Sequence, residues 1–253
     1  ASGGIGEVFA RKLAARGQNL LLVARSEEKL AALALELSRA HNVSASHFAA
    51  DLVDADAPAR LLAEVARRGL EIDTLINNAG FGSVGEFHRL DVESELRMID
   101  LNVRALVELT HRFLPPMRAR GRGAIINVAS TASFQPVPLM ATYAATKAFV
   151  LSFSMALWEE NRAAGVRVLA LCPGSTDTNF FRVAGTETPP PNITQTPETV
   201  VDTALSALER GRSHVVSGWG NFLMAESSRL APRSLVTRIA GKILKQRYKG
   251  RET

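Results

Sequence analysis

The sequence predicts a single-domain α/β fold built on a doubly wound parallel sheet of the Rossmann type. Short runs rich in Val, Ile and Leu alternate with longer segments of helical period along nearly the whole chain of 253 residues. This alternation is typical of βαβ units with right-handed crossovers. The short runs are nearly continuous in apolar residues, as expected of strands buried on both faces. No internal repeat and no linker divides the sequence, so one domain is expected.

The elements follow one another in regular order behind a glycine-rich start, ASGGIG, and a helix expected over about 7–16. Strands are predicted over 19–25, 46–52, 74–80, 123–130, 166–172 and 214–217. Between them we expect helices over 26–41, 57–69, 92–114, 143–165 and 197–211. Ser26 suits the N-cap position of the helix over 26–41. Pro115 and Pro116 are expected to end the helix over 92–114.

The start of the sequence carries an expectation of its own. In a dinucleotide-binding fold a mid-sheet strand precedes the glycine turn and carries its first glycine. Because the sequence opens within that turn, we expect the natural protein to begin upstream of Ala1 with the first strand.

Two segments differ in character from the rest of the predicted domain. Residues 175–196 are polar and contain three consecutive prolines, and loops of this length are usually functional or disordered. We therefore expect a substrate lid at about 175–196. Residues 229–253 are expected to form a basic amphipathic extension behind a catalytic domain that covers 1–228.

The charge is concentrated in this extension. The whole chain has a formal net charge of +5, but the segment from Arg229 to the end holds eight Lys/Arg and a single acid, Glu252. The upstream body then carries 22 basic and 24 acidic residues. A body without excess positive charge does not suit a phosphate backbone, so nucleic-acid binding is not expected.

The composition limits the cellular location and the kinds of site that can be expected. No uninterrupted apolar run is long enough to cross a bilayer. Cys172 is the single cysteine, which indicates a reducing, cytoplasmic location and a small core residue rather than a nucleophile. The five histidines lack metal-ligand spacing, so we predict no metal site.

The glycine-rich start suggests phosphate binding. Gly3, Gly4 and Gly6 precede a helix, whose N-terminal N–H groups favour a phosphate while glycine allows its close approach. The following strand ends with Arg25 where an acid would select NAD through the ribose 2′-hydroxyl. Arginine pairs with a 2′-phosphate, so NADP(H) is favoured, while NAD(H) remains the alternative.

The stretch YAATK suggests proton transfer. Tyr143 and Lys147 stand at i and i+4, so on a helix they share one face. A phenol titrates near ~10 and becomes a useful acid when a nearby cation stabilises its phenolate. Alone, the pair could equally be a packed tyrosine beside a solvated lysine. Ser130, Asn78 to Gly80, Pro173 and Gly174 follow predicted strands, so they fall on the edge that Tyr143 can reach.

Several short motifs stand in a specific order: NNAG at 77–80, DLNV around Asn102, NVAS ending at Ser130, YAATK at 143–147 and CPG at 172–174. In this order they resemble the short-chain dehydrogenase/reductase (SDR) family over nearly the whole chain. Ser130 and Tyr143 are thirteen residues apart, which is close to the family's spacing. ASGGIG resembles the latter part of the family's TGxxxGxG cofactor loop. Two departures are the Thr-Gly and strand that would precede it, and Gly3 where many NADP-using members have a basic residue.

The resemblance implies hydride transfer between nicotinamide and a carbonyl or alcohol. Tyr143 would be the general acid, and Lys147 would lower its pKa, together with the positive nicotinamide ring, and hold the ribose hydroxyls. Ser130 would position the carbonyl oxygen, and Asn102 would anchor a water that links Lys147 to solvent. The simpler alternatives are that Ser130 only caps a turn and that Asn102 only satisfies helix backbone.

Arg25 is expected at the cofactor because of its place at the end of a strand. The other contacts are implied by the matched motifs: Asp51 in AADL would contact the adenine, and the loop after CPG would contact the nicotinamide. The residues expected at the cofactor are Ser2, Gly3, Gly4, Ile5, Gly6, Arg25, Asp51, Leu52, Asn78, Ala79, Gly80, Tyr143, Lys147, Pro173, Gly174, Thr176 and Thr178.

The substrate is predicted only as a class. Phe180, Phe181 and Val183 in the lid, with 137–140 opposite, would favour an apolar ketone, aldehyde or ketoacyl compound, although simple core packing of these residues is equally compatible. The leading function is therefore an NADP(H)-dependent oxidoreductase. The alternatives are an NAD-dependent alcohol or hydroxysteroid-type dehydrogenase and a non-catalytic NADP(H)-sensing module.

Two surfaces suggest partners. The resemblance implies a homodimer or homotetramer through the long helices at 91–114 and 143–161. In the extension, Leu235, Val236, Ile239 and Ile243 share one helical face, and Arg238, Lys242, Lys245 and Lys249 surround it. Such a helix either lies on an anionic membrane surface or covers the enzyme or its oligomer partner.

Overall fold

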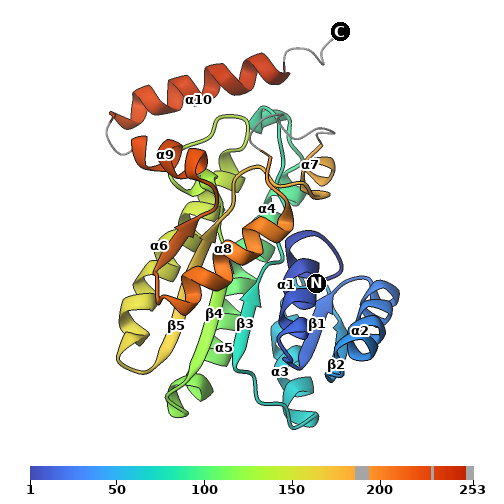
Figure 1. Ribbon diagram of the computed structural model, residues 1–253. Helices are drawn as coiled ribbons and strands as arrows, with labels where there is room; N and C mark the ends of the chain where they lie inside the picture. The colour runs from blue at the N-terminus through green and yellow to red at the C-terminus, as the bar shows by residue number, and fades with distance from the viewer. Residues whose placement is uncertain (186–193, 229–230, 249–253) are drawn as a thin grey trace.

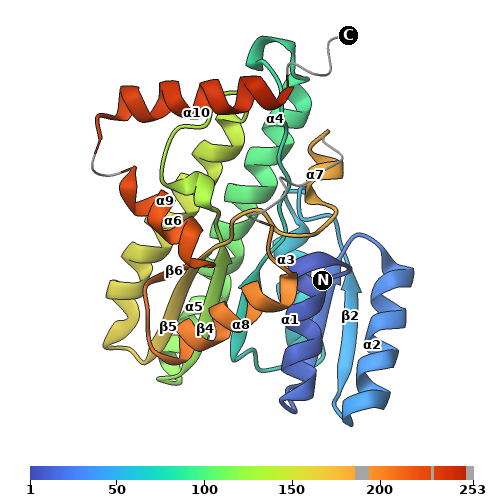
Figure 2. The ribbon, with the colours of Figure 1, turned by 45° about the horizontal axis from the view of Figure 1, so that its top comes forward.

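The strands of the computed structural model run parallel in two sheet sections (Figures 1 and 2). The structure describes residues 1–185, 194–228 and 231–248, and side chains up to residue 245. One section pairs β1 (Leu20–Ala24) with β2 (Ala45–Ala49). The other has the order β3 (Thr74–Asn77), β4 (Gly123–Val128), β5 (Val166–Cys172) and β6 (His214–Val216). The prediction of a parallel Rossmann-type α/β fold is confirmed.

Helices cover both faces of the sheet because the strands bury both. Along β4, Ala124, Ile126 and Val128 pack with α1 (Gly4–Ala15) and α8 (Pro197–Glu209). The intervening Ile125 packs on the opposite face with α3 (Ala57–Arg67) and α5 (Leu106–Ala119). The long helix α6 (Ala141–Arg162) lies beside α5, and α2 (Glu27–His41) flanks α1 (Figure 1). These layers fix the sheet edge on which the motif residues lie.

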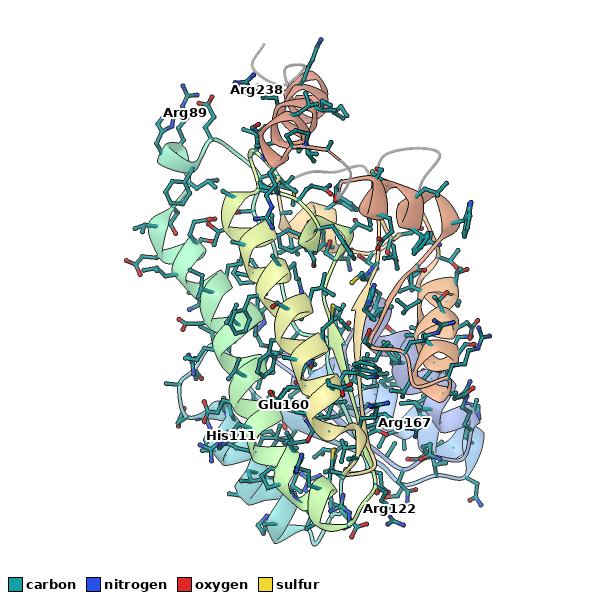
Figure 3. All side chains as sticks on the ribbon, turned by 90° about the vertical axis from the view of Figure 1, so that its left-hand side faces the viewer. Arg89, His111, Arg122, Glu160, Arg167 and Arg238 are labelled. Carbon is teal, nitrogen blue, oxygen red and sulfur yellow. The ribbon has the colours of Figure 1, made fainter. Side chains whose placement is uncertain are left out.

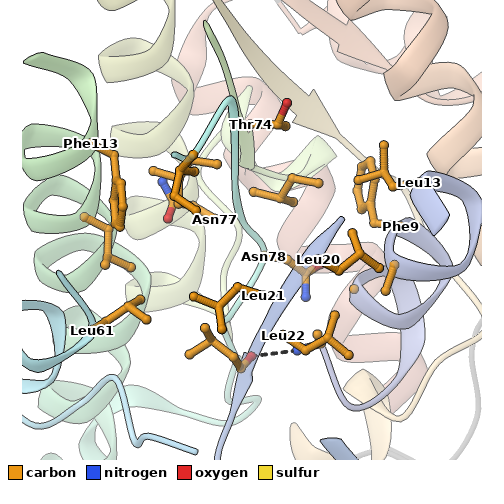
Figure 4. Close-up of a pocket in the computed structure, with 18 of the residues that line it drawn as sticks. Phe9, Leu13, Leu20, Leu21, Leu22, Leu61, Thr74, Asn77, Asn78 and Phe113 are labelled. Carbon is orange, nitrogen blue, oxygen red and sulfur yellow. Dashed lines mark hydrogen bonds between the residues drawn. The ribbon is translucent and has the colours of Figure 1, made fainter. Parts of the chain in front are cut away.

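A cavity of about 420 Å³ separates the two sheet sections. Its walls include the facing edges of β1 and β3 and the α1 side chains Phe9 and Leu13, as Figure 4 shows. The Ala1 nitrogen donates a hydrogen bond to the Val23 carbonyl at 2.9 Å. The cavity lies at the mid-sheet position where the fold prediction places a strand ahead of the glycine turn.

The helix predicted over 92–114 differs from expectation in two ways. It is interrupted by a π-helical segment, Asp100–Ala105, between α4 (Val92–Ile99) and α5. It also continues through Pro115 and Pro116 to Ala119, so the expected end was wrong. The prolines cost hydrogen bonds only in the last turns of α5, where the buried side chains of Phe113 and Met117 hold the helix against the sheet.

Three helices lie near the carboxyl ends of the strands. The first, α7 (Phe180–Val183), is within the expected lid, of which 186–193 falls outside the described residues. The second, α9 (Trp219–Ser227), was not predicted from the sequence. The extension forms α10 (Arg233–Tyr248), which crosses this end of the molecule (Figures 1 and 2). None of the described helices has the length and apolar composition that crossing a bilayer requires.

Candidate active site

The first turns of α6 bring Tyr143 and Lys147 to the carboxyl edge of β4. Both side chains are buried. The Lys147 ammonium group donates to the Val128 carbonyl at 2.7 Å and lies 5.8 Å from the centre of the Tyr143 ring. The alternative of a solvated lysine is therefore wrong, because this lysine is held inside the fold.

Burial controls the ionisation of this pair. It raises the pKa of Tyr143 to about 12, which a hydrogen bond from Ser130 partly counteracts. It lowers the pKa of Lys147 to about 8, although the nearby Cys172 thiol acts in the opposite direction. The phenol pKa thus lies above its ordinary value, because the loss of hydration of the phenolate outweighs the other contributions. The expected lowering, which includes the positive nicotinamide ring, stays a prediction.

Ser130 both caps a turn and contacts the tyrosine. Its hydroxyl accepts a hydrogen bond from the Ala132 N–H at 3.1 Å at the start of the 3-10 turn Thr131–Ser133. It also lies near enough to the Tyr143 phenol to lower the pKa of that group. The Ser133 hydroxyl in turn donates to the Lys147 carbonyl at 2.8 Å, which fastens this turn to α6. Capping and contact with the phenol are therefore compatible.

Asn102 lies in the π-helical segment and is buried. Its amide nitrogen donates to the Phe81 carbonyl at 2.9 Å and to the Thr146 hydroxyl at 3.1 Å. Its oxygen accepts from the Phe81 N–H at 3.2 Å. The amide therefore joins the NNAG loop to the YAATK helix. A Cβ on Gly80 would lie 2.9 Å from the Asn102 oxygen and 3.4 Å from the Lys147 nitrogen, so glycine allows this close approach.

A buried polar network supports the site and was not predicted from the sequence. Asn77 donates to the Thr110 hydroxyl at 3.0 Å and to the Asn127 oxygen at 2.8 Å. Asn127 donates to the Ser154 hydroxyl at 2.9 Å, which reaches α6. An asparagine within each of two otherwise apolar strands, TLIN and GAIINV, was the available signal, since buried amides need partners.

The glycine-rich start fits the phosphates of a dinucleotide. Gly3 is the N-cap of α1, and Gly4 has a φ of +56°, which favours glycine. A Cβ on Gly4 would lie 3.1 Å from the Thr178 methyl group, and one on Gly6 would lie 2.7 Å from the Asn78 amide nitrogen. Ser2 and Ile5 flank these glycines. The loop thus presents bare backbone at a helix N-terminus beside the 174–178 loop.

The residues expected at the adenosine end follow neighbouring parallel strands. Arg25 comes directly after β1 and is exposed. Asp51 and Leu52 come shortly after β2. One Asp51 oxygen accepts from the Val53 N–H at 3.1 Å, and the other is 3.4 Å from Arg97. The structure therefore places Arg25 and Asp51 on one edge of the sheet.

The residues expected at the nicotinamide end form one ordered loop after β5. The Pro173 carbonyl accepts from the Thr131 N–H at 2.8 Å, just past Ser130. A Cβ on Gly174 would collide with the Asn221 amide. Thr176 is buried and pairs with Gln195 across the base of the lid. This pairing ties the beginning and the end of the lid together.

Aromatic rings from the lid lie over the tyrosine. The Phe180 and Tyr143 ring centres are 5.2 Å apart, and Phe181 packs edge-on against Phe180. A Cβ on Gly82 would lie 2.9 Å from Phe180 and 3.0 Å from Tyr143. Val183 is 60% exposed, so it is not a core residue. Residues 137–140 are half-buried, and the Leu139 carbonyl accepts from the Gly85 N–H at 2.9 Å.

A Rossmann-type sheet with this edge defines a dinucleotide-dependent oxidoreductase. Comparison with known proteins agrees. A family model described as short chain dehydrogenase matches residues 1–188. The chain belongs to this family, whose members are oxidoreductases that act on CH–OH or C=O groups with NAD(P).

Individual relatives span most of the chain. A very-long-chain 3-oxoacyl-CoA reductase of Bos taurus is 32% identical over 97% of this chain and 78% of its own length. A short-chain dehydrogenase from Sphingobium yanoikuyae, solved with NADPH, is 33% identical, with a TM-score of 0.83 over 91% of both chains. A solved 7β-hydroxysteroid dehydrogenase is 28% identical, with a TM-score of 0.86 over 95% of this chain and 93% of its own.

Proposed function

We propose that this protein reduces the carbonyl group of an apolar ketoacyl-type substrate with NADPH. The observation that carries the proposal is the buried pair of Tyr143 and Lys147, with Ser130 beside the phenol, at the carboxyl edge of the sheet. A carbonyl oxygen at that edge would meet a serine hydroxyl and a phenol together.

The cofactor would be held along this edge. Bare backbone from Gly3 to Gly6 suits the pyrophosphate, and Arg25 suits a 2′-phosphate. The relative from Sphingobium yanoikuyae was solved with NADPH, which supports the same choice here. Bound NADPH would supply the hydride.

The chain's own groups would supply position and a proton. Ser130 would orient the substrate oxygen, and Tyr143 would give that oxygen its phenolic proton. With a pKa of about 12 the phenol is protonated at neutral pH, which is the form that reduction requires. Lys147 would hold the ribose hydroxyls, and Asn102 would keep the NNAG loop and α6 together. The predicted water at Asn102 stays a prediction.

The substrate class rests on the apolar surroundings of Tyr143 and on the relatives. Phe180 covers one side of the tyrosine ring, so a polar substrate would lose hydration there. The named activity of the bovine relative is reduction of a very-long-chain 3-oxoacyl-CoA, which supports a ketoacyl substrate. The solved 7β-hydroxysteroid dehydrogenase favours a hydroxysteroid as the second candidate.

The test is a substrate panel followed by NADPH absorbance. We expect oxidation of NADPH with 3-ketoacyl thioesters at a rate that rises with acyl length, and slower oxidation with short ketones and aldehydes. Steroid ketones and NADH complete the panel. Cofactor binding without turnover of any compound would favour the non-catalytic sensing module.

We also propose self-association and a peripheral location. Exposed apolar side chains lie on α4 and α6, the helices expected at an oligomer interface: Val92, Leu96, Ile99, Phe149 and Met155. Light scattering coupled to size exclusion would show a homodimer or homotetramer. A cytoplasmic enzyme with peripheral membrane contact through 229–253 fits the charge of the extension.

A further inference from the structure

The C-terminal helix α10 packs on the protein around Gly241 and leaves three of its large apolar residues outside. Gly241 is buried, and a Cβ there would lie 3.1 Å from the Pro138 ring. Ala240 and Leu244 are half-buried. The helix therefore rests on the loop that connects Ser130 with Tyr143, with glycine permitting the contact.

Three large apolar residues of α10 face away from the protein. Leu235, Ile239 and Ile243 are 48%, 51% and 49% exposed. Their spacing of four residues places them in one row along the helix. We call this row the apolar strip. As the alternative expected, α10 does cover part of the enzyme, but the apolar strip does not take part in this contact, whereas Val236, predicted on the same face, is half-buried.

A basic row runs beside the apolar strip. Arg238, Lys242 and Lys245 are exposed. Arg238 and Lys242 each stand next to a strip residue in the sequence, and Lys245 lies one turn beyond Lys242. Within the described part of the chain, none of the three makes an ion pair with a carboxylate. Figure 3 shows Arg238 at the end of the molecule opposite Arg122, which precedes β4. The basic row therefore lies at the carboxyl end of the strands.

We propose that α10 docks this end of the enzyme on an anionic phospholipid surface. The apolar strip would enter the boundary between headgroups and acyl chains, and the basic row would lie against the phosphates. Charge complementarity favours an anionic lipid surface as the partner, because the segment from Arg229 onward has eight Lys/Arg and one acid. Two copies meeting through these rows would bring like charges together.

The docking has a consequence for substrate delivery, which rests on the proposed function. Pro138, on which α10 sits, belongs to the loop between Ser130 and Tyr143. A membrane bound to the outer side of α10 would therefore lie close to the substrate end of the sheet. A long acyl chain could pass from the bilayer to the site without crossing much water.

The first experiment measures binding to vesicles without any turnover. Full-length protein is sedimented with vesicles of phosphatidylcholine, with and without phosphatidylglycerol, at low and high salt. We expect pelleting only with the anionic lipid, and less of it at high salt. Ile239→Asp should lower the partition coefficient by about tenfold or more, because a charge replaces an apolar contact.

Matched variants separate the strip from general surface effects. Leu35 on α2 is 52% exposed, like Ile239, so Leu35→Asp should leave pelleting unchanged. Replacing Arg238, Lys242 and Lys245 together by Gln should lower partitioning by about fivefold for each charge removed. The charge control replaces three other exposed arginines together by Gln: Arg39 on α2, and Arg210 and Arg212, which follow α8. Circular dichroism checks the fold, and Ile239→Gln serves if the aspartate variant unfolds.

Three results would overturn the docking. One is equal pelleting of wild type and Ile239→Asp. Another is pelleting that does not depend on anionic lipid. The third is a loss of oligomer in Ile239→Asp by light scattering without lipid, which would assign the strip to a second copy of the chain.

Substrate delivery is tested separately. With a ketoacyl substrate embedded in anionic vesicles, Ile239→Asp should lower the rate at least as much as it lowers binding, while the rate with a short soluble ketone stays unchanged. Equal loss on both substrates would contradict delivery from the bilayer. If no compound is reduced, the proposed function fails, but the sedimentation result for docking still stands.

Discussion

Helices α6 and α10 of this protein differ in which side chains they bury: α6 buries polar groups, and α10 exposes apolar ones. In α6, Tyr143 and Lys147 are buried, and the Lys147 nitrogen is bound to the Val128 carbonyl. In α10, the row from Leu235 to Ile243 is about half exposed. Burying polar groups and exposing apolar groups both lower the stability of the fold, so each arrangement is expected to serve a function. The comparison indicates that α6 serves chemistry and α10 serves contact with a partner.

The largest effect is expected at the tyrosine of α6. Tyr143→Phe removes the proton donor and keeps the ring that packs against Phe180, so turnover should fall by roughly 10³-fold or more. Binding of NADPH, measured by its fluorescence, should change little. Phe180→Leu, which alters the packing but not the proton donor, is the matched control. Retained turnover in Tyr143→Phe would remove α6 from the chemistry and break the comparison.

The sequence predicted the chemical residues better than their environment. Tyr143 and Lys147 were identified from their spacing on a helix and Ser130 from its place after a strand, at the edge where strand ends define the site. Asn102 was identified only through the resemblance of DLNV to the SDR family. The π-helical segment that carries Asn102 has no marker in local propensity. The raised pKa of Tyr143 depends on burial, which sequence spacing does not record.

The orientation of α10 illustrates the same limit. Its helical period was visible in the sequence, but the face that packs is decided by a tertiary contact between Gly241 and Pro138. Leu235, Ile239 and Ile243 were the natural choice for the buried face, and the structure leaves them outside. Which face of an amphipathic helix packs therefore depends on shape as well as on hydrophobicity.

The second prediction concerns how the buried Lys147 of α6 changes the free energy of unfolding with pH. Because burial lowers the pKa of Lys147 from 10.5 to about 8, the unfolded chain binds more protons than the folded one between these values. The free energy of unfolding should therefore gain about 2 kcal/mol from this group as pH rises from 8 to 10. Lys147→Met should remove this gain, as measured by urea unfolding at both pH values.

The tyrosine supplies an internal check on that experiment. Its folded pKa of about 12 lies above its ordinary value of 10.0, so its contribution is complete below pH 10 and is lost only as pH rises from 10 to 12. It therefore leaves the interval from pH 8 to 10 nearly unaffected. An unchanged pH dependence in Lys147→Met would mean that the lysine is not charged and buried in the manner described.

The third prediction tests the choice of cofactor at the opposite end of the sheet edge. Arg25→Glu replaces the group suited to a 2′-phosphate with one that repels it and can bind a 2′-hydroxyl. The KM for NADPH should rise about tenfold or more, while that for NADH falls. Lys29→Glu, an exposed charge change of the same sign on α2, is the control. Equal effects of the two variants would reduce Arg25 to a general electrostatic influence.

The smallest effect separates the two helices most clearly. Ile239→Asp changes a residue of α10 whose side chain is 51% exposed, so kcat with a short soluble ketone should stay within about twofold of wild type. Stopped-flow or steady-state NADPH absorbance measures this. A large fall in kcat with the soluble ketone would mean that α10, through Pro138, controls the loop between Ser130 and Tyr143. In that case the exposed and the buried helix would act on the same step, and α10 could not be treated as a separate contact surface.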